Sequence, residues 1–299
     1  MAARAAKVEE VYGAKLRDFT TVGIGGPAGR MVFPRSLHEI QEVLREEGGE
    51  GRGVRILGAG SNLLVHDDGV PGTVLCLKKN MGKILFSADG SVVAEGGTML
   101  PRFAVLCALS GLSGVEELAG IPGTVGGAMS MNAGAYGRFI GEIAEWVEVV
   151  DAKGELHRIE SREVGFAYRE AELPVRGVIA RAGFRLAKGV ADASFARIKE
   201  LNERRRASQP WGERTFGSTF RNPPEDKAGR LLERAREADI RAGLRLGAAL
   251  GVLARAGRDK VTLVLSEKIR ALGGWIEQLL AELHGQAAAE LHSAPLVVR

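Results

Sequence analysis

The chain has 299 residues, of which 45% are apolar and 26% are charged, so it can form two or three packed units with a sizeable core. Its net charge of +4 is compatible with anionic small molecules but too small to predict nucleic-acid binding, since the only basic cluster is Arg204–Arg206. No apolar stretch approaches the roughly 18 residues of a membrane span, and the N-terminal residues lack a signal-peptide core. We therefore expect a cytoplasmic protein without membrane insertion, in which Cys76 and Cys107 are buried free thiols.

The stretch SLHEIQEVLREEGG predicts the first helix. Ser36 is expected to cap it, Glu39 to close a capping box, and Gly48 to end it. One face of this helix carries the apolar residues Leu37, Ile40 and Leu44.

The stretch VRILGAGSNLLV predicts a strand over Val54–Leu57, a glycine turn, and a second strand over Leu63–Val65. Its GAGSNL core is similar to a dinucleotide-binding fingerprint, but that fingerprint needs a third glycine and a following helix. Pro71 and Gly72 come too soon for such a helix, so the pattern disfavours a Rossmann unit.

Residues 70–190 alternate short β-like runs with turn signals, which predicts an α+β unit. PRFAVLCALSGLSG predicts a helix with Pro101 in its first turn. DASFARIKELNERRRA predicts another, capped by Asp192 or Ser194, with Phe195, Ile198 and Leu201 on one face. The Pro-, Gly- and Ser-rich residues that follow indicate a domain boundary near the end of this helix.

Seven glycines lie between Gly114 and Gly137, and no lysine or arginine occurs between Arg102 and Arg138. A phosphate bound there must be held by main-chain N–H groups, helped by the side chains of Thr124, Ser130 and Asn132. The turn at Gly58–Asn62 has the same composition, so the two turns together suit the diphosphate of a dinucleotide. The alternative is that the glycines serve only tight turns and close packing.

Several motifs follow one another between Phe19 and Leu232: FTTVGIGGPAG, LGAGSNLLV, GVEELAGIPGTVGGAMSMNAGAYG, FAYR, RRRASQP and GSTFRNP. In this order they resemble the motifs of the UDP-N-acetylenolpyruvoylglucosamine reductase (MurB) family, short subtype. The resemblance implies an α+β fold: a two-subdomain FAD-binding fold of the vanillyl-alcohol-oxidase type in residues 1–205, divided into about 1–68 and 69–205. A smaller α/β substrate domain is implied for residues 206–299.

The resemblance also implies the cofactor site. We expect FAD to contact Gly58, Ala59, Gly60, Ser61, Asn62, Leu63, Pro122, Gly123, Thr124, Val125, Gly126, Asn132, Ala133 and Gly134. No metal site is expected.

In this family, NADPH delivers a hydride to FAD, which passes it to the enolpyruvyl group of a UDP-sugar during peptidoglycan synthesis. The resemblance implies that Arg169 holds the substrate carboxylate, because a rigid, permanently charged guanidinium suits a carboxylate better than lysine does. It also implies that Ser218 donates the proton. Substrate contacts are expected from Tyr168, Arg221 and Asn222. Glu290 is the nearest match to a third catalytic residue, whereas another register places Leu296 there. The UDP-sugar and NADPH are the expected partners of a monomer or weak homo-oligomer.

Two other interpretations stay open because the C-terminal motifs depart from the family pattern. One is a flavin-binding paralogue with lost or altered catalysis, and the other is an oxidase of the same superfamily. Taken singly, Ser218 fits a turn cap and Arg169 fits a surface ion pair with Glu170 or Glu172.

Overall fold

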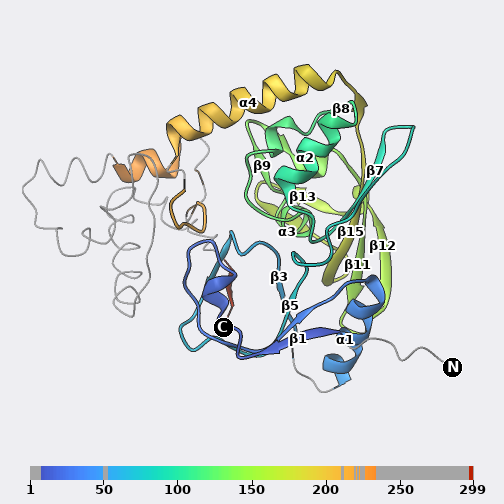
Figure 1. Cartoon of the computed structure of the whole chain (residues 1–299), viewed down its shortest axis with the longest axis vertical. Coiled ribbons are helices and arrows are strands. Elements are labelled where there is room, and N and C mark those ends of the chain that lie inside the picture. The colour runs from blue at the N-terminus through green and yellow to red at the C-terminus, as the bar shows by residue number, and fades with distance from the viewer. Residues whose placement is uncertain are drawn as a thin grey trace, which may run out of the picture.

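The computed structural model describes residues 8–49, 53–209, 212–218, 220, 222, 226–233 and 296–298. In this part of the chain the elements form two larger sheets, four two-stranded sheets and helices packed around them (Figure 1). None of the helices described here has the length and apolar character needed to cross a membrane.

The first sheet has four strands, in the order β1 (Glu9–Tyr12), β2 (Ala28–Phe33), β5 (Val70–Cys76) and β3 (Arg55–Leu57). Strand β1 is antiparallel to β2, whereas β2, β5 and β3 are mutually parallel. The subdomain boundary expected near residue 68 precedes β5, which is still a strand of this first sheet. The chain passes to the second sheet only after Cys76, the last residue of β5.

The second sheet has five antiparallel strands. Their order is β12 (Leu156–Glu160), β11 (Ala144–Asp151), β15 (Gly177–Arg185), β7 (Ser91–Glu95) and β6 (Ile84–Phe86). Helices α2 (Leu100–Leu109) and α3 (Val125–Ser130) contribute to one core with this sheet, in which the rings of Phe103 and Phe184 lie 4.8 Å apart.

Short elements complete the fold. The paired strands are β8 (Leu112–Ser113) with β16 (Ala187–Lys188), β9 (Gly134–Ala135) with β10 (Arg138–Phe139), and β13 (Gly165–Ala167) with β14 (Glu170–Glu172). The 3-10 turns are η1 (Leu16–Asp18), η2 (Glu116–Leu118), η3 (Ile140–Glu142) and η4 (Ser161–Glu163).

Helix α1 (Leu37–Gly49) joins the two sheets through a shared apolar cluster, in which Ile40 meets Leu75 of the first sheet and Val150 of the second. Ser36 caps it as predicted, accepting a hydrogen bond from the Glu39 N–H at 3.2 Å. The Glu39 carboxylate binds the N–H of Arg35 at 2.7 Å instead of that of Ser36, so the predicted capping box is shifted by one residue.

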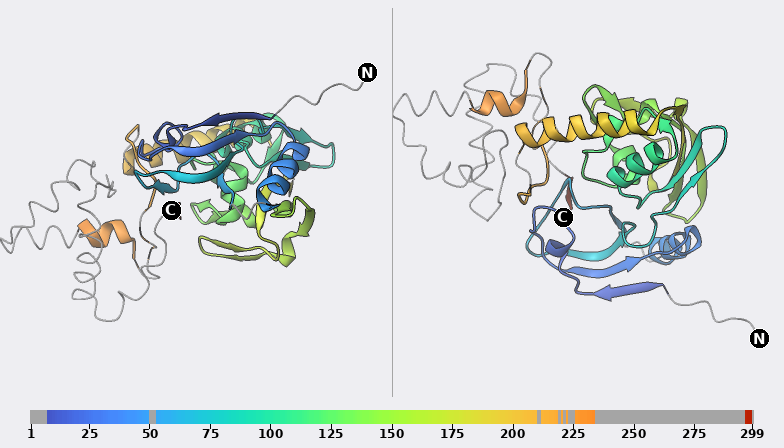
Figure 2. Two further views of the ribbon diagram at one scale, coloured as in Figure 1. Left: turned by 90° about the horizontal axis from the view of Figure 1, so that it is seen from below. Right: turned by 45° about the horizontal axis from the view of Figure 1, so that its top comes forward.

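Helix α4 (Ala191–Ser208) passes beside α2, as the further views show (Figure 2). Ile198 and Leu201 are buried on the predicted face. The predicted cap was wrong, because the N-cap residue is Val190 without a side-chain hydrogen bond. Ser194 is buried in the first turns and donates instead to Glu116 at 2.6 Å.

The expected C-terminal substrate domain, residues 206–299, lies largely outside the described residues. One piece of it, β17 (Leu296–Val298), pairs in parallel with β4 (Leu63–Val65) and places Leu296 opposite Leu63. The chain therefore returns to the FAD-binding half near its C-terminus.

Candidate functional site

Two glycine-rich loops, the one after β3 and the one before α3, lie against each other. The Ser61 hydroxyl donates a hydrogen bond of 2.7 Å to the carbonyl oxygen of Pro122. A methyl group on Gly58 would lie 2.5 Å from Thr124 Oγ1, so the approach leaves no room for a side chain. The loops predicted to share one ligand therefore form one continuous wall, with its two parts in different subdomains.

The first loop offers a row of main-chain donors. Among the described residues, no acceptor takes the N–H groups of Ala59, Gly60, Ser61 or Asn62. Gly60 has φ of +67°, and a Cβ there would lie 2.0 Å from the carbonyl oxygen of Phe19, so glycine is required. Successive unpaired N–H groups in a tight turn form a site for phosphate oxygens. This loop therefore fits the diphosphate of FAD.

The second loop differs, because most of its donors are already used. The N–H groups of Val125 and Gly126 donate to Thr98 and Gly96 at 2.8 Å each. The hydroxyl of Thr124 caps α3 by accepting from Gly127 N–H at 3.3 Å, and the Ser130 hydroxyl donates to the Gly127 carbonyl oxygen at 2.9 Å. These side chains, which were expected to help hold phosphate, are therefore engaged in forming the helix.

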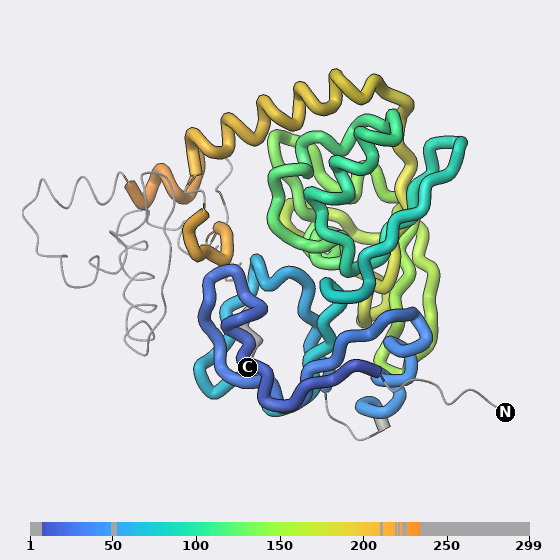
Figure 3. The backbone as a smooth tube through the Cα atoms, in the orientation of Figure 1, coloured from blue at the N-terminus to red at the C-terminus, as the bar shows by residue number. Residues whose placement is uncertain are grey.

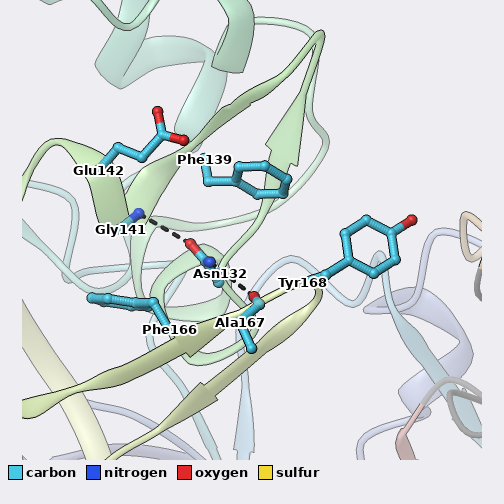
Figure 4. A pocket seen from close by; sticks show the side chains of 7 residues that line it. All are labelled: Asn132, Phe139, Gly141, Glu142, Phe166, Ala167 and Tyr168. Atoms are coloured by element: carbon cyan, nitrogen blue, oxygen red, sulfur yellow. Dashed lines mark hydrogen bonds between the residues drawn. The ribbon is translucent and has the colours of Figure 1, made fainter. Parts of the chain in front are cut away.

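Asn132 is likewise engaged within the protein. Its Nδ2 donates to the carbonyl oxygen of Ala167 at 2.9 Å, and its Oδ1 accepts from Gly141 N–H at 3.1 Å (Figure 4). The residue is buried and has a left-handed φ of +43°. Its side chain thus ties the loop after α3 to the β13–β14 hairpin instead of pointing a free amide at a cofactor.

Arg169 lies in the two-residue turn of that hairpin. Its φ is +59°, a left-handed conformation that is unfavourable for any residue with a side chain. The guanidinium lies 5.6 Å from the ring centre of Tyr168, the other turn residue. In the described part of the chain Arg169 forms no ion pair, so the alternative of a surface pair with Glu170 or Glu172 is not observed.

The segment that carries Ser218 lies beside the first glycine-rich loop, where the gold tube after α4 meets the blue N-terminal loops (Figure 3). The Thr21 hydroxyl donates to the carbonyl oxygen of Thr215, and the Thr21 N–H donates to Gly60 at 3.0 Å. A Cβ on Gly217 would lie 3.6 Å from the carbonyl oxygen of Ser61. Ser218 therefore follows directly after this contact.

A hydrogen bond links the Ser218 segment to the Arg169 hairpin. Asn222 Nδ2 donates to the hydroxyl of Tyr168 at 3.2 Å. Two predicted substrate residues thus contact each other, one next to Arg169 and the other four residues after Ser218. The other predicted residues, Arg221 and Glu290, lie outside the described residues.

A cavity of about 370 Å³ opens beside the hairpin. Its lining combines predicted residues with two unpredicted phenylalanines, as Figure 4 shows: Asn132, Phe139, Gly141, Glu142, Phe166, Ala167 and Tyr168. The rings of Phe139 and Tyr168 meet edge to face at 6.4 Å. Phe166 belongs to the FAYR motif, but the motif gave no role to that residue. Sequence reasoning missed Phe139 because it lies two residues beyond the quoted glycine-rich motif and no periodicity marks it.

The two cysteines are buried free thiols, as predicted. Burial raises the pKa of Cys76 and raises that of Cys107 to about 12. Both thiols are therefore protonated at neutral pH and are poor nucleophiles.

Comparisons with known proteins agree with this geometry. The FAD binding domain family matches residues 28–160. A UDP-N-acetylenolpyruvoylglucosamine reductase from Gluconobacter oxydans (strain 621H) is 38% identical over 263 residues, which cover 84% of each chain. One from Synechococcus sp. (strain CC9605) is 42% identical over 224 residues, covering 74% of this chain and 75% of that protein.

A solved structure agrees as well. The crystal structure of UDP-N-acetylenolpyruvylglucosamine reductase (MurB) from Thermus caldophilus superposes with a TM-score of 0.71 at 33% identity, covering 92% of this chain and 95% of that chain. The predicted α+β FAD-binding fold is confirmed. The chain therefore belongs to the UDP-N-acetylenolpyruvoylglucosamine reductase family and is an FAD-dependent oxidoreductase.

Proposed function

We propose that this protein reduces UDP-N-acetylenolpyruvoylglucosamine to UDP-N-acetylmuramate with NADPH, in cytoplasmic peptidoglycan precursor synthesis. The observation that carries the proposal is the convergence of three segments. The first glycine-rich loop contacts the Ser218 segment at Gly217, and that segment is hydrogen-bonded through Asn222 to the hairpin of Arg169. A cofactor held by the loop therefore lies among the residues that the family resemblance assigns to substrate.

The main-chain N–H groups of Ala59, Gly60, Ser61 and Asn62 are the groups proposed to hold the FAD diphosphate. Gly123, at the start of the second loop, approaches the same turn, because a Cβ there would lie 3.6 Å from Ser61 Oγ. Bound FAD supplies the hydride chemistry of the reaction, taking a hydride from NADPH and releasing it to the enolpyruvyl β-carbon.

Arg169 is proposed to bind the substrate carboxylate. Hydride addition at the β-carbon places negative charge on the α-carbon and its carboxylate, and a permanently charged fork stabilises that charge as it forms. Arg169 lies in the hairpin turn, and the hydrogen bond from Asn132 Nδ2 to the carbonyl oxygen of Ala167 holds the hairpin against the loop after α3. The strained φ of Arg169 is consistent with a position selected for function.

Ser218 is proposed to donate its hydroxyl proton to the α-carbon. The O–H bond breaks, a C–H bond forms, and the serine oxygen recovers a proton from solvent. Because a serine hydroxyl is a weak acid, the proton must be delivered at close range. The preceding residue, Gly217, has a φ of +87°, and a Cβ there would lie 3.6 Å from the carbonyl oxygen of Ser61.

A second candidate is a flavin-binding protein with altered catalysis, and the C-terminal strand favours it. Strand β17 places Leu296 beside Leu63, immediately after the FAD loop. This position supports the register in which Leu296, rather than Glu290, stands where the family has its third catalytic residue. A leucine there can neither share a proton nor stabilise an enolate.

The two candidates are separated by following the flavin absorbance of purified protein without oxygen. If the protein is the reductase, NADPH bleaches the flavin and UDP-N-acetylenolpyruvoylglucosamine restores its colour. Restoration by oxygen alone would support the second candidate.

A further inference from the structure

Arg205 differs from the other arginines of its triplet. Arg204 is exposed and pairs with Glu200 at 3.0 Å, whereas Arg205 is half-buried on the face of α4 that looks toward the site. One turn earlier on that face, the carbonyl oxygen of Leu201 accepts a hydrogen bond from the Tyr136 hydroxyl at 2.9 Å. This bond fixes the end of α4 against the β9–β10 hairpin.

The side chain of Arg205 lies across Gly120, which directly precedes the second glycine-rich loop. A methyl group on Gly120 would be 3.2 Å from Arg205 Cδ and 3.7 Å from Nη1. The guanidinium is therefore held at the edge of the candidate cofactor site by contact with bare main chain.

No acidic group among residues 8–49 and 53–209 is ion-paired with this guanidinium. Within the described residues neither Arg205 nor Arg169 has an ion-pair partner. Burial lowers the pKa of Arg205, the Tyr136 phenol opposes that change, and the charge of Arg169 adds to it. Two guanidiniums whose charges act on each other, and which have no acidic partner in the part of the chain that the structure describes, can bind an anion from outside the chain.

Backbone strain is concentrated at the same place. The described residues contain three left-handed residues other than glycine: Asn132, Tyr136 and Arg169. Each has a structural link to the two guanidiniums. Tyr136 holds α4, Asn132 holds the Arg169 hairpin, and Arg169 carries one of the charges. Such strain is typical of ligand-binding sites.

We propose that Arg205 acts with Arg169 to bind the anionic oxygens of the UDP-sugar substrate. This inference rests on the proposed function, but it adds a residue to which neither the motifs nor the comparisons give a role. The anion is either the enolpyruvyl carboxylate or a phosphate of the diphosphate. Each has two oxygen atoms that can accept a pair of hydrogen bonds from one guanidinium.

The test is calorimetric binding to FAD-saturated full-length protein without NADPH. The variants are Arg205→Met, which keeps the length of the side chain, and Arg205→Lys, which keeps only the charge. Arg204→Met is the matched control, since it removes the same charge one residue away. The two ligands are UDP-N-acetylenolpyruvoylglucosamine and UDP-N-acetylglucosamine, which keeps the diphosphate but lacks the carboxylate.

We expect Arg205→Met to weaken substrate binding about 10- to 100-fold, Arg205→Lys to weaken it less, and Arg204→Met to leave it unchanged. A loss for both ligands identifies the diphosphate as the anion, and a loss for the enolpyruvyl ligand alone identifies the carboxylate; either supports the proposal. If Arg205→Met binds both ligands with wild-type affinity, the proposal is wrong. This holds even if that variant binds FAD more weakly than the wild type does. If the wild-type protein binds neither ligand, the proposed function itself fails.

Discussion

The Ser61 hydroxyl donates a hydrogen bond of 2.7 Å to the carbonyl oxygen of Pro122, which joins the loop after β3 to the loop before α3. The first loop follows a strand of the four-stranded sheet, the second precedes a helix that packs on the five-stranded sheet, and 61 positions of the sequence separate the two bonded residues. This bond closes the wall to which the FAD diphosphate is assigned. It therefore connects the architecture of the fold with retention of the cofactor.

Ser61→Ala removes that bond without removing a main-chain donor. One lost hydrogen bond of this kind costs about 1 kcal/mol, so we expect the Kd for FAD to rise about fivefold. Quenching of flavin fluorescence during titration of the apoprotein measures it. Ser113→Ala is the control, since the Ser113 hydroxyl makes only a 3.5 Å contact with Ala187 away from the loops. An equal change in both variants would contradict the role of Ser61.

Gly58→Ala introduces a methyl group 2.5 Å from Thr124 Oγ1. Thr124 is buried and caps α3, so it has no room to move away. We expect a loss of about 1–3 kcal/mol in the free energy of unfolding, together with weaker FAD binding. Thermal unfolding with and without added FAD measures both effects. Gly82→Ala, where the nearest atom is 4.0 Å from the new Cβ, should change neither.

Arg169→Gly relieves the left-handed backbone strain at φ of +59° and removes the guanidinium. We therefore expect opposite effects on stability and on turnover. The free energy of unfolding should rise by about 1 kcal/mol, while turnover falls by orders of magnitude. Chemical denaturation and steady-state kinetics on the same preparation test both. A variant that is less stable, or equally active, would contradict the assignment.

Glu116→Gln tests how α4 is attached. One carboxylate oxygen accepts from Ser194 at 2.6 Å and the other from Gly114 N–H at 2.8 Å, so glutamine sets an NH2 group against one of these donors. We expect a loss of about 1–3 kcal/mol at pH 7, seen as a lower Tm. If Tm does not change, α4 is not anchored by this group.

The stabilisation by Glu116 should also depend on pH. Burial raises its pKa, but the hydrogen bonds from Ser194 and the main chain outweigh burial, so its pKa lies below the usual value for a glutamate. A carboxylate with a lowered folded pKa stabilises the fold above its unfolded pKa and loses that effect as the pH falls through the folded pKa. The Tm difference between wild type and Glu116→Gln should therefore shrink on acidification. A difference that is constant with pH would contradict this.

Leu296→Glu and Glu290→Gln decide between the two C-terminal registers. If Leu296 occupies the position of the family's third catalytic residue, Leu296→Glu raises kcat and Glu290→Gln leaves it unchanged. If Glu290 is the catalytic group, Glu290→Gln lowers kcat by orders of magnitude and Leu296→Glu does not raise it. Rates of anaerobic flavin re-oxidation by substrate distinguish the two results.

Local features of the fold were predictable because each depends on neighbouring residues. Ser36 caps α1, Pro101 lies in the first turn of α2, and glycines separate β3 from β4, all as the sequence indicated. Ser194 was mispredicted as a cap. A serine near the start of a helix can bind either a main-chain N–H of the first turn or a polar group elsewhere in the fold. The distant Glu116 is the partner it binds, and no local pattern contains that information.

The site was predictable only in part for the same reason. The motifs predict the FAD loops, Arg169 and Ser218 as site residues, but they do not indicate which polar groups already have protein partners. Asn132 carries an amide that could bind phosphate, and the fold uses it to hold the hairpin. Arg205 was seen as one member of a basic triplet, because its contact with Gly120 spans 85 residues.

We propose that Ser218 protonates the substrate beside FAD held by the first glycine-rich loop. The two anaerobic half-reactions of Ser218→Ala, followed by flavin absorbance in a stopped-flow instrument, measure this role. We expect NADPH to reduce the flavin at the wild-type rate and UDP-N-acetylenolpyruvoylglucosamine to re-oxidise it about 10²–10⁴ times more slowly than in the wild type. Re-oxidation of the variant at the wild-type rate would show that Ser218 is not the proton donor.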